Sequence, residues 1–491
     1  MKRYIVGIDE GTTSARAGVF DTKTNKIVSL SQKPISLIYP KLGWVEIDAN
    51  AIWSVQRSVL IEAVSNADIE PEEIFGIGIT NQRETVVAWD RLTGKPITNA
   101  ICWQCRRTAK DIEKLSPENK KMIKEKTGLI PDAYFSATKM KWIIENVKEA
   151  KVLLKEHRLC MGTIDSYIIF RLTKGVFVTD TTNASRTMLF NIKTLSWDED
   201  LLKLFKIPLE VLPKVVSSND VVGSTTIFGK DVVISGIAGD QQSALFGQAC
   251  FSKGMLKNTY GTGGFLLVNT GDKPVMAKKL LTTIAYTLGG KTTYALEGSV
   301  FNCGSTVQWI RDGLGIIKKS SETEKMALSV EDNAGVYLVP AFTGLGAPYW
   351  DMNARGLVVG LTRAVNKNHI ARAALEAMAY STEDLIEEMR NENVIVTEMR
   401  VDGGASNNKF LMQFQSSLSD VVINVPTNLE LTLMGVVYLA GLATGAYKSL
   451  DELSGLWRMQ LQYLPKHTKD YDKLYAGWKK AVTRALNWEE N

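Results

Sequence analysis

Near the start of the chain, one short segment combines side chains that are suited to handling phosphate. Asp9 ends an apolar run, the turn Gly11-Thr12-Thr13-Ser14 follows it, and Arg16 lies just beyond the turn. Backbone N–H groups in a glycine turn form a concave binding site for anions. Hydroxyl groups add donors, and a guanidinium is a planar fork that fits phosphate oxygens. Asp9 would repel a phosphate unless a divalent cation lay between them, so the segment also indicates Mg²⁺.

The same residues would suit an ordinary β-hairpin with a polar turn, and other segments of the chain decide between the two interpretations. The glycine turns Gly261-Thr262-Gly263 and Gly403-Gly404-Ala405 also follow predicted strands, and Asp240 comes at the end of another. One glycine after a strand is usually only a turn. Three such turns, with Asp9 and Asp240 at strand ends, favour a cleft that binds phosphate and a metal ion.

These glycine turns differ from two common nucleotide-binding motifs. None contains the lysine of a Walker A phosphate loop. None reads Gly-x-Gly-x-x-Gly before a helix with an acidic residue about twenty positions later, so a dinucleotide-dependent dehydrogenase is poorly supported.

The elements that must position these residues form a pattern that occurs twice. Apolar runs at residues 4–8, 75–80, 232–237 and 255–260 predict buried strands, each followed by polar residues. The strand–turn–strand pattern of residues 4–20 returns in weaker form at residues 255–269. A chain of 491 residues is too long for one core. We therefore predict an α/β fold of two related domains, residues 1–252 and 253–491, that face one catalytic cleft.

Composition excludes several other classes of protein. The net charge of +5 is spread along the chain, so no nucleic-acid partner is expected. The longest apolar stretch, residues 431–447, is marginal for a membrane span and better suits a core helix. The five cysteines are odd in number and widely spaced, which argues against a disulfide framework and for a cytoplasmic protein. Cys102-Trp-Gln-Cys105 has redox spacing but no second pair, and with three histidines in the chain zinc is not expected.

The glycine turns resemble those of the actin-like ATPase superfamily, whose members share two ribonuclease-H-like domains that close on ATP. Within it, residues 134–146 and 356–376 resemble the two signatures of the FGGY carbohydrate kinases. Further segments are similar to the members of that family that phosphorylate glycerol, at residues 78–85, 103–107, 182–190, 236–242 and 340–350. The resemblance covers essentially the whole chain and implies ATP-dependent phosphorylation of glycerol to sn-glycerol 3-phosphate.

The resemblance also implies which residues hold the triol. Its hydroxyl groups would bond to polar side chains, and two aromatic rings, Trp103 and Phe265, would cover its carbon backbone. The polar residues are Arg83, Glu84, Tyr134, Asp240 and Gln241. A site built to pair with hydroxyls rejects poorer ligands, because its buried groups would then stay unpaired. The competing interpretation of Arg83-Glu84 is a surface ion pair, worth ~1 kcal/mol or less.

Asp240 is the expected catalytic base, which accepts the proton of the primary hydroxyl as that oxygen attacks the γ-phosphorus in line. Asp9 and Asp240 are the expected metal residues, with Asp9 holding Mg²⁺ through water. The nucleotide would be bound by two groups of residues. The phosphate group comprises Thr12, Thr13, Ser14, Arg16, Gly261 and Thr262, and the nucleoside group comprises Gly304, Gln308, Gly404 and Asn408.

Two alternatives remain at this point. One is an FGGY kinase that acts on another polyol or on a ketose. The other is an actin-like or chaperone-type switch, in which ATP drives a conformational change and nothing is phosphorylated. The family also implies a homo-oligomer, a dimer or tetramer, although no interface can be identified from the sequence.

Overall fold

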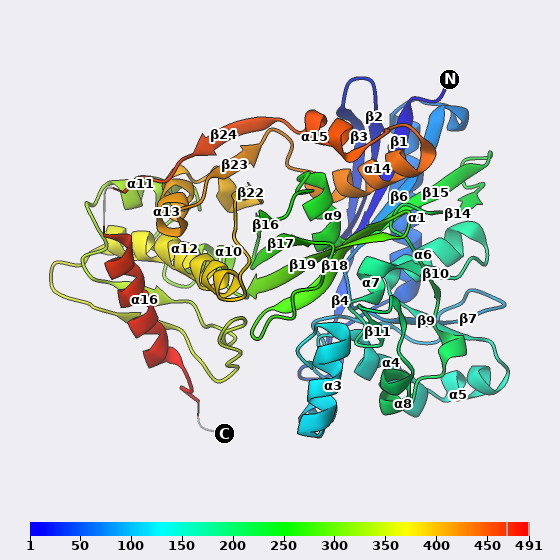
Figure 1. The fold of residues 1–491 in the computed structure, drawn as a ribbon, viewed down its shortest axis with the longest axis horizontal. Helices are drawn as coiled ribbons and strands as arrows, with labels where there is room; N and C mark the ends of the chain where they lie inside the picture. Colours follow the sequence, from blue (N-terminus) through cyan, green and yellow to red (C-terminus); the bar gives the residue numbers. More distant parts are fainter. Residues whose placement is uncertain (468–469, 490–491) are drawn as a thin grey trace.

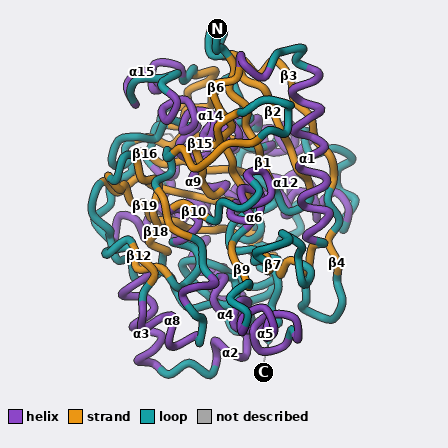
Figure 2. The backbone as a smooth tube through the Cα atoms, turned by 90° about the vertical axis from the view of Figure 1, so that its right-hand side faces the viewer, coloured by secondary structure: helices purple, strands orange, loops and turns teal. Residues whose placement is uncertain are grey.

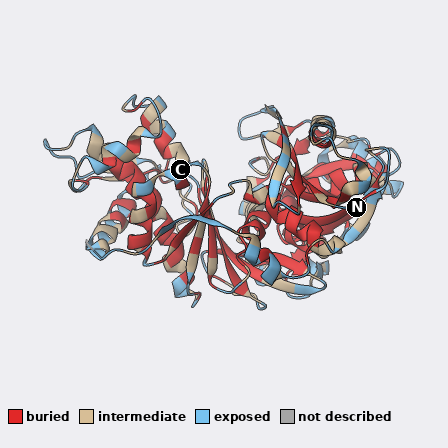
Figure 3. Cartoon of the chain, turned by 90° about the horizontal axis from the view of Figure 1, so that it is seen from above, coloured by how far each residue is buried: buried red, intermediate tan, exposed pale blue. Residues whose placement is uncertain are grey.

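The computed structural model describes residues 1–467 and 470–489. It shows a mixed α/β chain arranged as two lobes, each with buried residues in its interior (Figures 1 and 3). Each lobe is built on one large sheet, and the hairpin that was expected at the start of each half begins that sheet.

The first sheet has the strand order β14-β15-β6-β1-β2-β3. In the predicted hairpin, β1 and β2 are antiparallel, and Asp9 lies opposite Arg16. On its other side β1 runs parallel to β6, and β6 runs parallel to β15, so the carboxyl ends of all three strands meet at one edge. The strands are β1 (Tyr4–Glu10), β2 (Ser14–Asp21), β3 (Lys26–Pro34), β6 (Ile74–Asn81), β14 (Val221–Thr225) and β15 (Val232–Gly239).

The second sheet has the order β18-β19-β17-β16-β22-β23-β24. Its strands are β16 (Met255–Tyr260), β17 (Gly264–Gly271), β18 (Leu281–Leu288), β19 (Lys291–Val300), β22 (Glu398–Asp402), β23 (Ile423–Pro426) and β24 (Met459–Tyr463). The segment β19-β17-β16-β22-β23 repeats β3-β2-β1-β6-β15 of the first sheet in order and in strand direction. This shared topology confirms the two-domain α/β fold that the repeated hairpin predicted.

Helices cover both sheets, and local sequence determines where several of them begin. Helix α1 (Ala49–Asn66) starts where the Asp48 carboxylate accepts the N–H of Asn50 at 2.9 Å, and it packs along β1, β2 and β3 (Figure 2). In the second half, Asn366 caps the long helix α12 (Lys367–Asn391). The other helices of the second half are α10 (Gly304–Asp312), α11 (Glu322–Leu328), α13 (Lys409–Ser419), α15 (Leu450–Leu456) and α16 (Tyr471–Ala485).

Helix α14 (Leu431–Thr444) joins the two halves. It is the predicted core helix, but it packs on β1, β6 and β15 of the first sheet and crosses α9 (Asp240–Gly247) (Figure 1). The crossing needs glycine, because a Cβ at Gly435 would lie 1.9 Å from the Ser243 carbonyl oxygen. One apolar cluster therefore includes side chains of both sheets and of α14. The domain boundary at residues 252 and 253 falls in the connection between α9 and β16 and stays a prediction.

The rest of the first half is an insertion between β6 and β14. Its helices are α2 (Ala109–Glu113), α3 (Pro117–Thr127), α4 (Ser136–Asn146), α5 (Lys148–Lys155), α6 (Ile164–Thr173), α7 (Thr181–Ala184) and α8 (Glu199–Phe205). Its strand pairs include β7 (Val87–Asp90) with β9 (Leu159–Gly162), and β10 (Val178–Asp180) with β13 (Lys214–Val216). Short strands complete the chain, namely β4 (Leu37–Ile38), β5 (Glu46–Ile47), β8 (Ala100–Ile101), β11 (Phe190–Asn191), β12 (Ser196–Trp197), β20 (Tyr337–Val339) and β21 (Leu357–Val359).

In the described part of the chain, every helix is too short or too polar to cross a membrane.

Candidate functional site

The phosphate hairpin has the geometry of a tight turn at the tip of β1 and β2. The Gly11 N–H donates to the Ser14 carbonyl oxygen at 3.0 Å. The Thr12 hydroxyl accepts the indole N–H of Trp103 at 2.9 Å, which brings a predicted phosphate residue and a predicted substrate residue together. Arg16 forms an ion pair with Glu430 at 3.1 Å, just before α14. The Arg16 guanidinium is therefore paired with a carboxylate from the second half of the chain.

Asp9 is suited to holding a cation. Burial raises the pKa of its carboxyl to about 7, the nearby Arg16 opposes that rise, and the carboxylates of Asp240 and Glu430 add to it. Among the described residues, no donor contacts either Asp9 oxygen. Mg²⁺ is usually held by one or two carboxylates together with substrate phosphates. Asp9 and Asp240 match that donor set.

Arg83 and Glu84 lie directly beyond the carboxyl end of β6, and both side chains are almost fully buried. Glu84 has a φ of +62°, which is unusual for a residue with a side chain. The Thr85 N–H donates to the Arg83 carbonyl oxygen at 2.7 Å, and this closes a strained γ-turn around Glu84. Such strain costs about 1–3 kcal/mol and occurs mainly at functional sites. The burial of Arg83 and Glu84 rules out the competing interpretation of these two residues as a surface ion pair.

A buried cluster of four charged residues surrounds this turn. Arg83 donates to Glu297 at 2.5 and 3.0 Å, and Arg186 donates to Glu84 at 2.7 Å and to Glu297 at 3.0 Å. The charges alternate in sign around the cluster, and each side chain is at most 2% exposed. Arg186 and Glu297 are residues that sequence reasoning missed. Glu297 belongs to the second sheet, so the cluster crosses between the domains.

Asp240 begins α9 at the carboxyl end of β15, beside Arg83. Its Oδ1 atom accepts the Gln241 N–H at 2.7 Å and lies 3.1 Å from Arg83 Nε. Its side chain is 31% exposed, and no donor in the described part of the chain contacts Oδ2. One carboxylate oxygen is thus held in place while the other is available to a ligand. This is the arrangement that a general base requires.

Trp103 and Tyr134 form an aromatic wall next to the cluster. Their ring centroids are 5.5 Å apart in an edge-to-face contact, and the Tyr134 ring lies 5.9 Å from the Arg186 guanidinium. The buried ammonium of Lys139 donates to the carbonyl oxygens of residues 133, 134 and 135 at 2.9, 2.5 and 3.0 Å. Lys139 therefore holds the loop that carries Tyr134. No described residue forms a hydrogen bond with the Tyr134 hydroxyl.

Gln241 and Phe265 share one support, the buried Lys257 of β16. Its ammonium donates to Gln241 Oε1 at 2.5 Å and to the Phe265 carbonyl oxygen at 3.3 Å. The amide oxygen of Gln241 is thus occupied, and its Nε2 group is a donor without a hydrogen-bond partner among the described residues. Burial lowers the pKa of Lys257 to about 8, although the carboxylates of Asp402 and Asp240 oppose the shift.

This lowered pKa predicts a decline in activity on the alkaline side. The ammonium form of Lys257 is present below pH 8 and is lost as the pH rises through about 8. We expect the activity that this site supports to fall over that range in the unsubstituted chain. The variant Lys257→Met should have lower activity, and it should lack the decline above about pH 8.

The measurement is a pH profile of wild type and variant in one buffer system. Burial also lowers the pKa of Lys139 to about 8, so a second lysine titrates in the same range. An alkaline decline that survives Lys257→Met would contradict this assignment and indicate Lys139 instead.

The predicted nucleotide residues of the second domain come from three loops that meet at close range. The Gly304 N–H donates to the Gly261 carbonyl oxygen at 2.9 Å, and the Cys303 N–H donates to the Thr262 carbonyl oxygen at 2.9 Å. At Gly403, where φ is +87°, a Cβ would lie 2.4 Å from the Tyr260 carbonyl oxygen. Only glycine permits this approach, and the structure thus brings residues 261–262, 304 and 403–404 together.

Gln308 and Asn408 lie on the helices that follow these loops. Gln308 is exposed on α10, one turn beyond Gly304. Asn408 caps α13, where its Oδ1 atom accepts the Leu411 N–H at 3.0 Å. Its amide nitrogen lies 3.4 Å from the Thr323 hydroxyl. The capping bond gives Asn408 a structural role, and its role toward a nucleotide stays a prediction.

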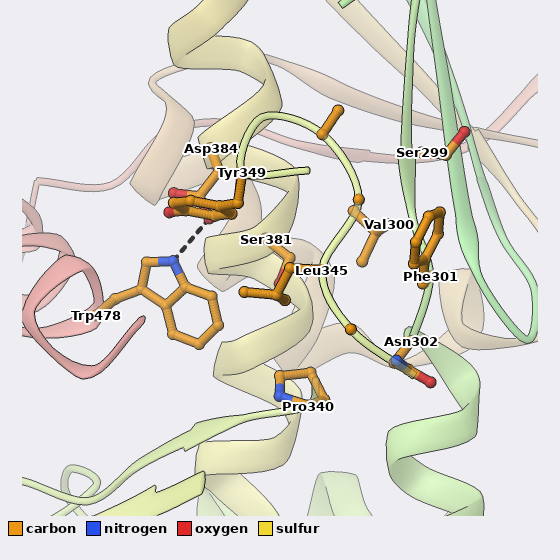
Figure 4. Close-up of a pocket in the computed structure, with 13 residues that line it drawn as sticks. Ser299, Val300, Phe301, Asn302, Pro340, Leu345, Tyr349, Ser381, Asp384 and Trp478 are labelled. Atoms are coloured by element: carbon orange, nitrogen blue, oxygen red, sulfur yellow. Dashed lines mark hydrogen bonds between the residues drawn. The ribbon is translucent and has the colours of Figure 1, made fainter. Parts of the chain in front are cut away.

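A further pocket lies inside the second domain, between the end of β19, the 344–349 loop, α12 and α16 (Figure 4). Its charged residue is Asp384, which accepts the indole N–H of Trp478 at 2.9 Å and the Tyr475 hydroxyl at 2.7 Å. These bonds engage both carboxylate oxygens of Asp384. None of the predicted site residues lines it.

Comparison with known proteins places both halves of the chain in one family. Residues 4–247 match the N-terminal domain of the FGGY family of carbohydrate kinases, and residues 256–444 match its C-terminal domain. The chain is 54% identical over 497 residues to a glycerol kinase of Clostridium botulinum strain Langeland, and the match covers 100% of both proteins. It is 52% identical over 495 residues to glycerol kinase 2 of Thermotoga maritima, covering 99% of this chain and 100% of that protein.

Solved structures agree with this comparison. Plasmodium falciparum glycerol kinase with ADP superposes with a TM-score of 0.93 at 37% identity, and the match covers 98% of each chain. A ligand-bound xylulose kinase of Lactobacillus acidophilus superposes with a TM-score of 0.86 at 25% identity, covering 98% of this chain and 96% of that one.

Proposed function

Because the chain belongs to the FGGY family of carbohydrate kinases, we propose that it transfers the γ-phosphoryl group of ATP to glycerol, forming sn-glycerol 3-phosphate. One observation of the site carries the choice of substrate. Four of the predicted substrate residues each keep one polar atom without a partner among the described residues. These atoms are Glu84 Oε2, Tyr134 OH, Asp240 Oδ2 and Gln241 Nε2.

These four atoms suit a small triol. Glu84 and Asp240 supply acceptors, Gln241 supplies a donor, and the tyrosine hydroxyl can act as either. Glycerol hydroxyls also donate and accept, so each can be paired. The ring of Trp103 lies beside Tyr134 and offers an apolar surface to the carbon backbone.

The chemistry follows from the free oxygen of Asp240. A primary hydroxyl of glycerol donates to Oδ2, and its oxygen attacks the γ-phosphorus of ATP in line. The new O–P bond forms as the bond to the β,γ-bridging oxygen breaks, ADP leaves, and the proton moves to Asp240. The glycine turns at residues 11–14 and 261–263 would present N–H groups and hydroxyls to the phosphates.

Asp9 and Asp240 would hold Mg²⁺ at this site. When bound, Mg²⁺ neutralises charge on the phosphate oxygens. Burial raises the pKa of the Asp9 carboxyl to about 7, and a bound cation would offset this shift by favouring the ionised form. The proposal also includes ATP binding by the phosphate group and the nucleoside group of residues that were named from the sequence.

We propose a cytoplasmic location, which is supported by the cysteines. Cys102, Cys105, Cys160, Cys250 and Cys303 are all free and buried, as expected of a protein from a reducing compartment. The homo-oligomer that the family implies stays a prediction and can be measured by light scattering.

A coupled assay of ADP release tests the function. Glycerol, dihydroxyacetone, xylulose and erythritol are compared at equal concentrations, with ATP alone as the control. We expect glycerol to give the highest kcat/KM. A higher value for xylulose would support the ketose-kinase alternative. ATP turnover that no polyol stimulates would contradict a kinase and favour the conformational switch.

A further inference from the structure

Glu297 places a carboxylate where a β-strand normally buries an apolar side chain. It lies within β19 of the second sheet, paired in register with Leu267 and Leu281 on the neighbouring strands. Its side chain is fully buried. A carboxylate in such a position is costly unless cations surround it. The two cations that form ion pairs with it, Arg83 and Arg186, both come from the first domain.

The contact between Glu297 and Arg83 is a two-pronged fork. Oε2 accepts from Nη1 at 2.5 Å, and Oε1 accepts from Nη2 at 3.0 Å. Oε1 also accepts from Arg186 at 3.0 Å. Burial alone would raise the pKa of Glu297, but Arg186 and Arg83 outweigh it and lower that pKa to about 2. The carboxylate is therefore ionised, and a paired fork of this kind fixes the plane of the guanidinium.

This fork determines which edge of Arg83 faces the reacting groups. Its Nη1 atom also donates to Gln242 Oε1 at 3.1 Å, so both terminal nitrogens are bonded to groups other than Asp240. The Nε edge then lies 3.1 Å from Asp240 Oδ1. If Glu297 released the fork, the terminal nitrogens of Arg83 could turn to the carboxylate of Asp240, which Arg83 already contacts through Nε. A bidentate pair between Arg83 and Asp240 would then cover Oδ2, the oxygen that the reaction needs.

We propose that Glu297 is a positioning residue, which holds Arg83 in its substrate-binding orientation and keeps its terminal nitrogens off Asp240. The inference rests on the proposed function, and it adds a residue of the second domain to a glycerol site otherwise built mainly from the first. The orientation of Arg83 thereby depends on how the two domains sit against each other.

The test compares Glu297→Gln with wild type in steady-state kinetics and in glycerol binding by calorimetry without ATP. Glutamine keeps the shape of the side chain but loses the charge that holds the fork. We expect the KM and the Kd for glycerol to rise about 10-fold or more, and kcat to fall, while the KM for ATP stays within about two-fold. An effect on the KM for ATP as large as that on glycerol would overturn the proposal, because it would indicate a general structural role.

Glu383→Gln is the matched control. Glu383 is a buried carboxylate of the same domain, on α12, and it pairs with Arg390 at 2.6 Å, apart from the charge cluster. We expect its KM for glycerol to stay within about two-fold of wild type. An equal rise in both variants would overturn the proposal.

A conservative variant keeps the test decisive if Glu297→Gln does not fold. Glu297→Asp retains the charge but shortens the side chain by one methylene group, so the fork can form only in part. We expect a rise in the KM for glycerol alone, smaller than in the glutamine variant. An unchanged KM for glycerol in either folded variant would overturn the proposal and leave the kinase function intact, whereas a wild-type chain that phosphorylates no polyol would remove both.

Discussion

Replacing Asp240 with asparagine is expected to lower kcat for glycerol phosphorylation by about 100-fold or more, which is the usual effect of losing a general base. The Asp240 Oδ2 atom has no partner among the described residues, while Oδ1 is held by the Gln241 N–H and by Arg83. Asparagine can keep the contact with the Gln241 N–H, but it cannot take a proton from the attacking hydroxyl.

The measurement is kcat at saturating glycerol and ATP, with folding checked by circular dichroism. Asp198→Asn is a suitable control, because Asp198 caps α8 in the same domain and asparagine is an equally good cap. The control should retain wild-type kcat. Turnover of Asp240→Asn close to that of wild type would show that another group accepts the proton.

The second large effect is expected from Arg83→Ala, which should raise the KM for glycerol about 10- to 100-fold and leave the KM for ATP much less changed. The physical reason is the loss of a charged donor beside the triol. The variant should also unfold more easily. It leaves the buried Glu297 with Arg186 as its remaining cation partner, and breaking a buried ion pair typically costs about 3–5 kcal/mol.

Two further variants separate the loss of binding from the loss of stability. Arg83→Lys keeps the charge but not the planar fork, so we expect it to recover part of the stability and little of the glycerol affinity. Arg158→Ala removes an arginine that pairs with Asp90 at 2.6 Å, away from the charge cluster, and its KM for glycerol should not change. Equal increases in KM for glycerol and ATP in Arg83→Ala would contradict a role in substrate binding.

Elements whose limits depend on local sequence were predicted well. The apolar run that begins at Tyr4 and the strand 255–260 both occur in the structure as expected. The same holds for the polar residues that follow strand ends, because a parallel sheet brings those ends to one edge. Asp240 Oδ1 and Arg83 Nε thus lie 3.1 Å apart, although the two residues are 157 positions apart in the chain.

The partners of these residues could not be predicted in the same way. Glu297 and Arg83 are 214 residues apart, and no local pattern relates them. The hairpin of β18 and β19 was not predicted at all, and Glu297, the charged residue within its apolar run, was therefore not identified as a site residue. That position was the available signal, since a carboxylate inside a buried strand requires a cation. Lys257, in an otherwise uncharged strand, offered the same signal.

The packing of α14 has a consequence for how this chain folds as the ribosome makes it. The strands β1, β6 and β15 are complete once residue 239 has been synthesised, but the helix that covers their shared face ends only at Thr444. Domains generally fold from the N-terminus during synthesis. The apolar face of the first sheet therefore remains uncovered by α14 while about 200 further residues are synthesised. The nascent chain is therefore vulnerable to aggregation for most of the second half of its translation.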